Sequence, residues 1–261
     1  MRRALSLLRP QPHYRAERFA AGLRAAGYEV CQAIPDPRPG DVILTWNRYG
    51  HYDDECRRFE RWGADVLIAE NSYLAGVVPG KWHALARSYH NDAATVREGS
   101  AERWKALGVD LMPWRTDGGH VLVCPNRPFG VVGRAMPIDW AADVCARLAR
   151  VTDREIRLRP HPGNKPPEKP LAKDLAGAWA TVIWSSSAGA HSLIAGVPVV
   201  CEAPHWICEI AAANRIEWID QLPRMLFSGN TREAALQLLA WAIWSVEEIE
   251  SGVAFKHLLH N

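Results

Sequence analysis

The chain has 261 residues, is 48% hydrophobic and 23% charged, and carries a formal net charge of +2. These values describe an ordinary globular protein and exclude a disordered, collagen-like or disulfide-framework chain. Residues 1–116 carry 17 Lys and Arg against 14 Asp and Glu, and residues 117–261 carry 14 against 15, so neither half has the basic excess typical of proteins that grip nucleic acid through its phosphates.

Short β-type runs alternate with helical patterns along most of the chain, which predicts parallel sheets covered by helices. In the first half, apolar runs predict strands at residues 4–8, 28–34, 41–46 and 64–69. Amphipathic patterns predict helices at residues 15–26, 52–62 and 100–107. A glycine follows each of these helices, as is usual just after a helix end.

A second series of strands and helices begins at Gly118. Strands are predicted at residues 120–124, 155–159, 180–184 and 198–202. Helices are predicted at residues 137–149, 188–195 and 231–251, the last as one long terminal helix. We therefore predict an α/β protein of two compact Rossmann-like lobes with parallel sheets, formed by residues 1–116 and 117–261.

The cysteines and one long uncharged segment indicate in which cellular compartment the protein works. The six cysteines form no CxxC pair, which indicates reduced thiols in a cytoplasmic protein. Residues 175–201 lack charged side chains, but three serines, His191 and Pro198 interrupt the stretch, which favours strand, turn, helix and strand over a membrane span. The apolar run at the N-terminus is too short for a signal peptide, so we expect no membrane association.

The most informative motif is the serine turn, Ser185, Ser186 and Ser187, between a predicted buried strand and a predicted helix. Hydroxyls, backbone N–H groups and the positive end of a helix dipole meet there, an arrangement typical of phosphate binding. A small residue in the first helical turn, Gly189, would let a ligand approach the backbone. The alternative is a serine that only caps the helix.

A second motif, Arg159-Pro-His161-Pro162, follows the strand predicted at residues 155–159. Open α/β sheets bind ligands at the carboxyl ends of their strands, and the flanking prolines restrict the backbone around the imidazole. An exposed turn with an incidental histidine is the alternative. Because the serine turn belongs to the same strand–helix series, the two motifs together favour a ligand site.

A strand ending in His161-Pro162, then a serine turn, a helix and the strand entry Gly196-Val-Pro-Val199, resembles the nucleotide-sugar-binding half of GT-B-fold glycosyltransferases. The likeness is to bacterial capsular-polysaccharide and sialyl-type transferases and covers roughly residues 118–204. It implies a GT-B-like fold with an acceptor-side lobe, 1–116, and a nucleotide-sugar-binding lobe, 117–261. It also implies that His161 and the three serines hold the donor's phosphates. A looser similarity is to phage-encoded glycosyltransferases, some of which modify viral DNA.

The chain departs from these families in being short and in lacking a Glu-x7-Glu motif, since Glu202 and Glu209 are seven residues apart. It also lacks an Asp-x-Asp motif, which disfavours a metal-dependent GT-A mechanism. We expect no metal and no required cofactor, with a UDP-, GDP-, CMP- or ADP-linked sugar as co-substrate.

Several of the other candidate site residues follow predicted strands. Glu70 is the first candidate for the base that deprotonates the acceptor hydroxyl, with His90 and Asp92 behind it; a capping or solvated carboxylate is the alternative. Arg127 is predicted to contact a donor phosphate, and Glu202 the ribose or base. The predicted acceptor-binding residues are Trp46, Asn47, Arg48 and Tyr49.

We therefore predict a metal-independent glycosyltransferase, for which an inverting displacement suits the His-Pro families. A hydroxymethylated pyrimidine in phage DNA, a capsular glycan and a small metabolite remain open as acceptors; a phage-encoded enzyme would work in the host cytoplasm. Two rival functions are a non-catalytic nucleotide-sugar-binding module and a nucleotide-sugar epimerase.

Overall fold

The computed structural model describes residues 2–163, 168–222 and 231–260. The chain forms two compact units: the first comprises Met1–Ser100 with Leu238–Asn261, and the second comprises Ala101–Gln237. These units differ from the predicted lobes 1–116 and 117–261. The difference arises because the C-terminal segment packs Trp241, Trp244 and Phe255 into the core of the first unit.

The first unit contains a six-stranded sheet with strand order β10-β5-β4-β3-β1-β2. Its strands are β1 (Arg2–Ser6), β2 (Tyr28–Cys31), β3 (Val42–Trp46), β4 (Asp65–Asn71), β5 (Trp82–Arg87) and β10 (Ile243–Ser245). Strands β1 to β4 are parallel, in agreement with the prediction, while β5 runs antiparallel to β4 and β10 antiparallel to β5. The carboxyl ends of β1, β3 and β4 therefore lie at one edge of this sheet, which we call its carboxyl edge.

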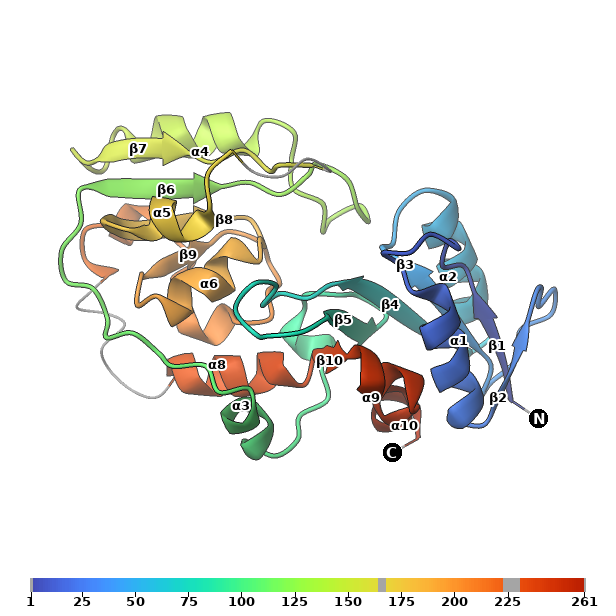
Figure 1. Cartoon of the computed structure of the whole chain (residues 1–261). Helices are drawn as coiled ribbons and strands as arrows, with labels where there is room; N and C mark the ends of the chain where they lie inside the picture. Colours follow the sequence, from blue (N-terminus) through green and yellow to red (C-terminus); the bar gives the residue numbers. More distant parts are fainter. Residues whose placement is uncertain (1, 164–167, 223–230, 261) are drawn as a thin grey trace. The chain divides into compact units, whose positions relative to one another are not determined.

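Helices cover both faces of this sheet (Figure 1). They are α1 (Ala16–Ala25), α2 (His51–Arg61), α9 (Val246–Glu250) and α10 (Val253–Leu259), with a 3-10 turn η1 (Ala93–Thr95). Helices α1, α9 and α10 pack with Leu44 and Leu67 on one face, and α2 packs through Phe59 with Ile43 on the other. Alternate side chains of a strand point to opposite faces, so each strand feeds both cores.

The predicted terminal helix over residues 231–251 is wrong. Helix α8 (Thr231–Ala240) ends before β10, and Trp244 is fully buried where β10 pairs with β5. Ser245 then begins α9 with a capping box: its Oγ accepts from Glu248 N at 3.1 Å, and Glu248 Oε2 accepts from Ser245 N at 2.9 Å. Burial of Ile243 and Trp244 in the sheet thus outweighs the local helical pattern.

The second unit contains a four-stranded, wholly parallel sheet with strand order β7-β6-β8-β9. Its strands are β6 (His120–Cys124), β7 (Glu155–Leu158), β8 (Ala178–Ile183) and β9 (Val199–Cys201). Its helices are α3 (Glu102–Ala106), α4 (Trp140–Leu148), α5 (Leu171–Leu175), α6 (Ala188–Ile194) and most of α8, with the 3-10 turns η2 (Glu209–Ala211) and η3 (Ile216–Trp218). Helix α4 packs on Val123 and Val182, whereas α6 lies on the other face, where Ser192 Oγ donates to Thr181 Oγ1 at 2.8 Å.

Both units are thus Rossmann-like α/β layers built on parallel strands, which confirms the predicted fold class. All six cysteines are free, as their spacing predicts. Within the described ranges, no helix combines the length and the hydropathy that a membrane span requires.

Candidate functional site

The carboxyl edge of the second unit's sheet gathers the two sequence motifs. Strand β7 leads into His161, β8 into Ser185, and β6, which lies between these strands, into Asn126 and Arg127. The backbone N–H of Ser185 donates to Asn126 Oδ1 at 3.0 Å. This bond joins the serine turn to the β6 loop. Asn126 is absent from the predicted site, although its position directly after a buried strand is the same signal that selects Arg127.

His161 is held in one tautomer. The backbone N–H of Gly163 donates to His161 Nδ1 at 2.9 Å, so the neutral ring carries its proton on Nε2. Loss of water contact at the ring and the positive charge of nearby Arg127 both lower the pKa of His161. The imidazole is therefore a neutral donor through Nε2–H near neutral pH.

Arg127 supplies the positive charge at this edge. Its guanidinium carbon lies 4.7 Å from the ring centre of Phe129. Within the described ranges, no carboxylate pairs with it. A guanidinium in this state is suited to an anionic ligand.

The three serines differ in exposure. Ser185 is buried, Ser186 is half-buried and Ser187 is exposed. Ser186 Oγ accepts from Ala188 N at 3.3 Å, and Ser187, the residue before α6, makes no capping hydrogen bond with its side chain. Of the Ser186 and Ser187 hydroxyls, capping therefore occupies at most one.

Gly189 faces the protein interior and not the proposed ligand. A Cβ at this position would lie 2.5 Å from Trp206 Cζ2 and 2.6 Å from Ile183 Cδ1. Glycine is required there because the fully buried Trp206 ring packs against the start of α6. The predicted ligand approach at Gly189 is replaced by a packing role.

Arg159 and Glu202, two further predicted donor residues, have protein partners. Arg159 pairs with Asp174 of α5 and donates to Lys169 O at 2.8 Å. Glu202 accepts from Trp140 Nε1 at 3.0 Å and from Arg147 Nη2 at 2.9 Å. Both side chains thus tie helices or loops to the sheet, and the structure does not present either as an open ligand contact.

In the first unit, a pocket of about 310 Å³, its open mouth included, lies at the carboxyl edge of the sheet. We call it the aromatic pocket; its lining residues are Leu7, Arg9, Tyr14, Trp46, Asn47, Tyr49 and Tyr52. Three of the four predicted acceptor residues are thus brought together. Of the other lining residues, Leu7 falls inside the strand predicted at residues 4–8, whereas β1 ends at Ser6. Arg9 follows that predicted strand, so its position gave the same signal that selects Arg127, but it was not selected.

Arg48, the fourth predicted acceptor residue, is buried away from the pocket. Its Nε donates to Asp53 Oδ1 at 2.8 Å, and its two terminal nitrogens donate to the Glu60 carboxylate at 2.7 and 2.6 Å. Nη1 also donates to Ser88 O at 2.9 Å. These bonds hold α2 to the loop after β5 and leave little of the guanidinium for a ligand.

The three candidate bases occupy different settings, and none is among the residues that line the aromatic pocket. Glu70 is half-buried at the end of β4, and its Oε1 accepts from Asn71 N at 2.9 Å. His90 is half-buried in the loop after β5. Asp92 is buried and caps η1 by accepting from Ala94 N at 2.9 Å, so Glu70 is the more available carboxylate.

Across residues 2–163, 168–222 and 231–260, no three His, Cys, Asp or Glu side chains group as metal ligands. Metal independence stays a prediction.

No protein-family model matches the chain, and no curated protein matches it in sequence. Among solved structures, it is similar to the KpsC beta Kdo 2,7 transferase of Thermosulfurimonas dismutans, with a TM-score of 0.58 and 12% identity over 98% of this chain and 99% of that one. It is also similar to the KpsC beta Kdo 2,4 transferase of the same organism, with a TM-score of 0.52 and 14% identity over 92% of this chain and 98% of that one. At such identities the likeness concerns the fold, and the chain has the GT-B-like α/β fold of these transferases.

Proposed function

We propose that this protein is a glycosyltransferase whose nucleotide-sugar donor binds at the carboxyl edge of the second unit's sheet. The observation that carries the proposal is the convergence of Arg127, His161 and the serine turn on that edge, where Asn126 bonds to Ser185. Parallel α/β sheets bind ligands at this edge. The fold likeness to two sugar transferases supports the same conclusion.

Each of these groups suits the phosphates of a nucleotide sugar. Arg127 supplies a positive charge, and His161 Nε2–H and the hydroxyls of Ser186 and Ser187 supply neutral hydrogen bonds. As the bond between sugar and phosphate breaks, negative charge grows on the departing phosphate. Donors that are already in place stabilise that charge more than they stabilise the intact donor.

The acceptor hydroxyl is proposed to lose its proton to Glu70. In a single inverting displacement, the acceptor oxygen bonds to the anomeric carbon while its proton passes to the carboxylate. The bond from that carbon to the phosphate oxygen breaks, and its electron pair leaves with the phosphate. Glu70 is the candidate because it lies one residue before the end of β4, the neighbour of the strand that carries Trp46 into the aromatic pocket.

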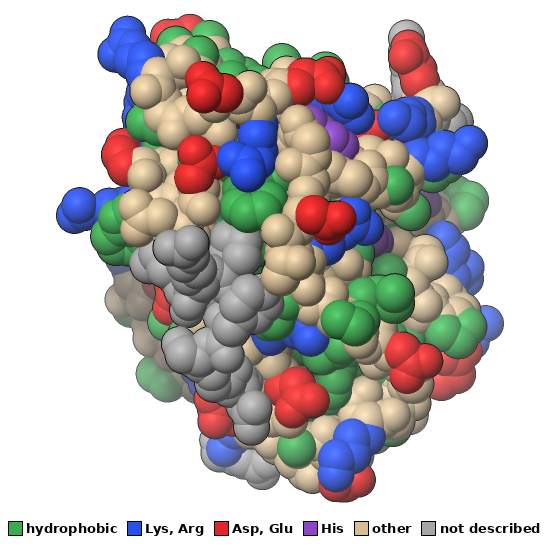
Figure 2. Space-filling model, turned by 90° about the vertical axis from the view of Figure 1, so that its left-hand side faces the viewer, with side chains coloured by type: hydrophobic (Ala, Val, Ile, Leu, Met, Phe, Trp, Pro, Cys, Tyr) green, Lys and Arg blue, Asp and Glu red, His purple; other side chains and the backbone are tan. Residues whose placement is uncertain are grey.

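For the acceptor we propose a glycan. The two similar structures are named as Kdo transferases, so a Kdo donor belongs in any donor panel. A phage DNA acceptor has no comparable support. On the face that Figure 2 shows, Lys and Arg side chains are interspersed with Asp and Glu and form no basic stripe, whereas phosphate-backbone binding favours such a stripe.

A thermal-shift screen over UDP-, GDP-, CMP- and ADP-linked sugars, with a Kdo donor included, tests the donor site. We expect one nucleotide class to raise the melting temperature, and His161→Ala to remove that shift. With the donor identified, His161→Ala should lower kcat/KM by about a hundredfold, the usual loss when one donor to a developing oxyanion is removed. His51→Ala, an exposed histidine of the first unit, is the matched control.

The rivals predict different products. A non-catalytic module would bind the donor and transfer nothing to any acceptor. An epimerase would convert the nucleotide sugar without an acceptor. Full turnover by Glu70→Gln would remove Glu70 as the base while leaving the donor site in place.

A further inference from the structure

The aromatic pocket combines a small volume with aromatic walls. Two edge-to-face pairs contribute to its lining: Tyr14 with Trp46, whose ring centres lie 4.9 Å apart, and Tyr49 with Tyr52, 6.1 Å apart. The enclosed part of the pocket is only about 60 Å³, well below the roughly 300–1,000 Å³ of pockets that bury a whole small molecule, so the pocket is a shallow, open one. Such a pocket can receive one face of a single sugar ring, whose apolar C–H groups can pack on the aromatic side chains, while the rest of the ring stays in solvent.

The pocket has one cation and no acidic side chain in its lining. Arg9 Nε donates to the Tyr52 hydroxyl at 3.4 Å, and no carboxylate within the described part of the chain pairs with Arg9. That hydrogen bond, together with the nearby phenols of Tyr14 and Tyr49, raises the pKa of Arg9. The guanidinium is thus permanently charged, and its remaining N–H groups can meet a planar anion in a bidentate manner.

The polar groups of the pocket are held by the sheet. Leu7 N donates to Leu44 O at 2.8 Å, and Asn47 N donates to Ala69 O at 3.2 Å. Asn47 has a φ of 66°, a conformation that costs free energy for a residue with a side chain and persists where the surroundings enforce it. Pro10 and Pro12 restrict the loop after Arg9. A pocket arranged before binding loses less entropy when a ligand enters.

We propose that the aromatic pocket binds the terminal sugar of an acidic acceptor glycan, with the sugar's carboxylate paired to Arg9. This inference rests on the proposed function and names the acceptor class that it takes. Arg9 is then the residue that determines acceptor specificity, and Trp46 and Tyr14 supply the surface for the ring. Neutral sugars of the same size would lack the ion pair.

Calorimetric titration of the full chain without donor tests the pairing. The probes are the methyl glycosides of glucuronic and galacturonic acid, each beside its neutral parent, methyl glucoside or methyl galactoside. We expect at least one acid to bind about tenfold more tightly than its parent, because a hydrogen-bonded ion pair in a pocket contributes that much or more. Arg9→Gln should abolish the difference, while Arg61→Gln, an exposed arginine at the end of α2, should preserve it.

Three outcomes would overturn the inference: no preference for either acid, a preference that survives in Arg9→Gln, or tighter binding of glucose 6-phosphate than of the glucuronide. Nucleoside monophosphates that bind in place of both acids would indicate a base-binding pocket and overturn it too. The donor site is assayed separately by the thermal shift. Acid binding with no donor-dependent transfer would therefore refute the proposed function alone, and transfer to neutral sugars only would refute this inference alone.

Discussion

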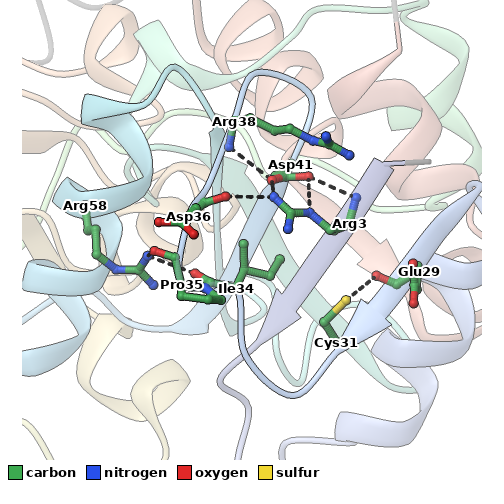
Figure 3. A network of polar contacts seen from close by, with 9 residues as sticks. All are labelled: Arg3, Glu29, Cys31, Ile34, Pro35, Asp36, Arg38, Asp41 and Arg58. Atoms are coloured by element: carbon green, nitrogen blue, oxygen red, sulfur yellow. Dashed lines mark hydrogen bonds and ion pairs between the residues drawn. The ribbon is translucent and has the colours of Figure 1, made fainter.

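At the amino edge of the first unit's sheet, Asp41 is buried, Arg3 and Arg58 are half-buried, and all three have protein partners. At the carboxyl edge, by contrast, the Arg9 guanidinium lies exposed among aromatic rings. Figure 3 shows the amino edge, where Asp41 is 1% exposed. Its carboxylate accepts from Arg3 N at 3.2 Å, Arg3 Nε at 3.1 Å and Arg38 N at 3.0 Å. Arg58 donates to the carbonyls of Ile34 and Pro35, both at 2.9 Å.

The contrast separates two uses of arginine in one sheet. Arg3 and Arg58 fix the loop that joins β2 to β3, so their hydrogen-bonding capacity is directed to the protein itself. Arg9, at the opposite edge, donates to the hydroxyl of Tyr52. Buried charges require partners to be tolerated, whereas an exposed cation can remain open to a ligand. The second unit shows the same contrast: Arg159 pairs with Asp174, whereas the guanidinium of Arg127 lies over the ring of Phe129.

The largest effect is expected from Asp41→Ala. The substitution leaves Arg3 partly buried without its carboxylate and frees the backbone N–H of Arg38, and breaking a buried pair costs about 3 kcal/mol or more. Urea unfolding followed by tryptophan fluorescence measures the loss, with Glu29→Gln, an exposed acid at the same edge, as the control. A loss below about 0.5 kcal/mol, the scale of surface substitutions, would show that the amino edge does not depend on this pairing.

Most strands could be predicted from the sequence, and the elements that could not depend on contacts between residues far apart in the chain. Alternating apolar runs locate β1 to β4 and β6 to β9 because each run is a buried strand between turn residues. Strand β10 has three residues and exists through its pairing with β5, a contact between Trp244 and His83 that no local pattern contains. The end of the chain was therefore predicted as helix.

Site residues could be predicted where they directly follow strands. Their availability to a ligand could not be predicted where they pair with side chains from distant helices. His161 and the serines belong to local motifs. The carboxylates that occupy Arg48 come from α2, and the one that occupies Arg159 comes from α5. The ring that excludes a side chain at Gly189 is that of Trp206. These pairings depend on how the helices pack, which spacing along the chain does not reveal.

The second expected effect concerns His83, which is buried on β5 with its ring 5.6 Å from that of Trp46. Burial, followed by the positive charges of Arg15 and Lys81, lowers the pKa of His83 to about 4. The unfolded chain takes up a proton near pH 6.5 and the folded chain only near pH 4, so stability is full above about pH 7 and falls as the pH decreases. Each pH unit contributes about 1.4 kcal/mol, which predicts a loss of about 2 kcal/mol between pH 7.5 and pH 5.

Urea unfolding at the two pH values measures this loss. His83→Leu should remove most of the pH dependence, because the variant has no proton to bind at this position, and His51→Asn should retain it. A pH dependence that is unchanged in His83→Leu would mean that other groups are responsible. Burial and the charges of Arg15 and Lys81 would then not control the pH dependence of stability through His83.

The smallest effect comes from comparing Arg127→Gln with Arg159→Gln, two arginines that follow neighbouring strands of one sheet. Arg127→Gln should lower kcat/KM for the donor by about tenfold, since a charge-assisted contact to phosphate is lost, and leave the unfolding midpoint unchanged. Arg159→Gln should do the reverse: it removes one of the two cationic partners of Asp174, the other being Lys169, and lowers stability by about 1 kcal/mol, while folded enzyme retains its kcat/KM. Steady-state kinetics beside urea unfolding separates the two. Loss of activity in fully folded Arg159→Gln would mean that Arg159 leaves Asp174 to bind the donor. In that case, an ion pair with a protein carboxylate would not be enough to classify an arginine as structural.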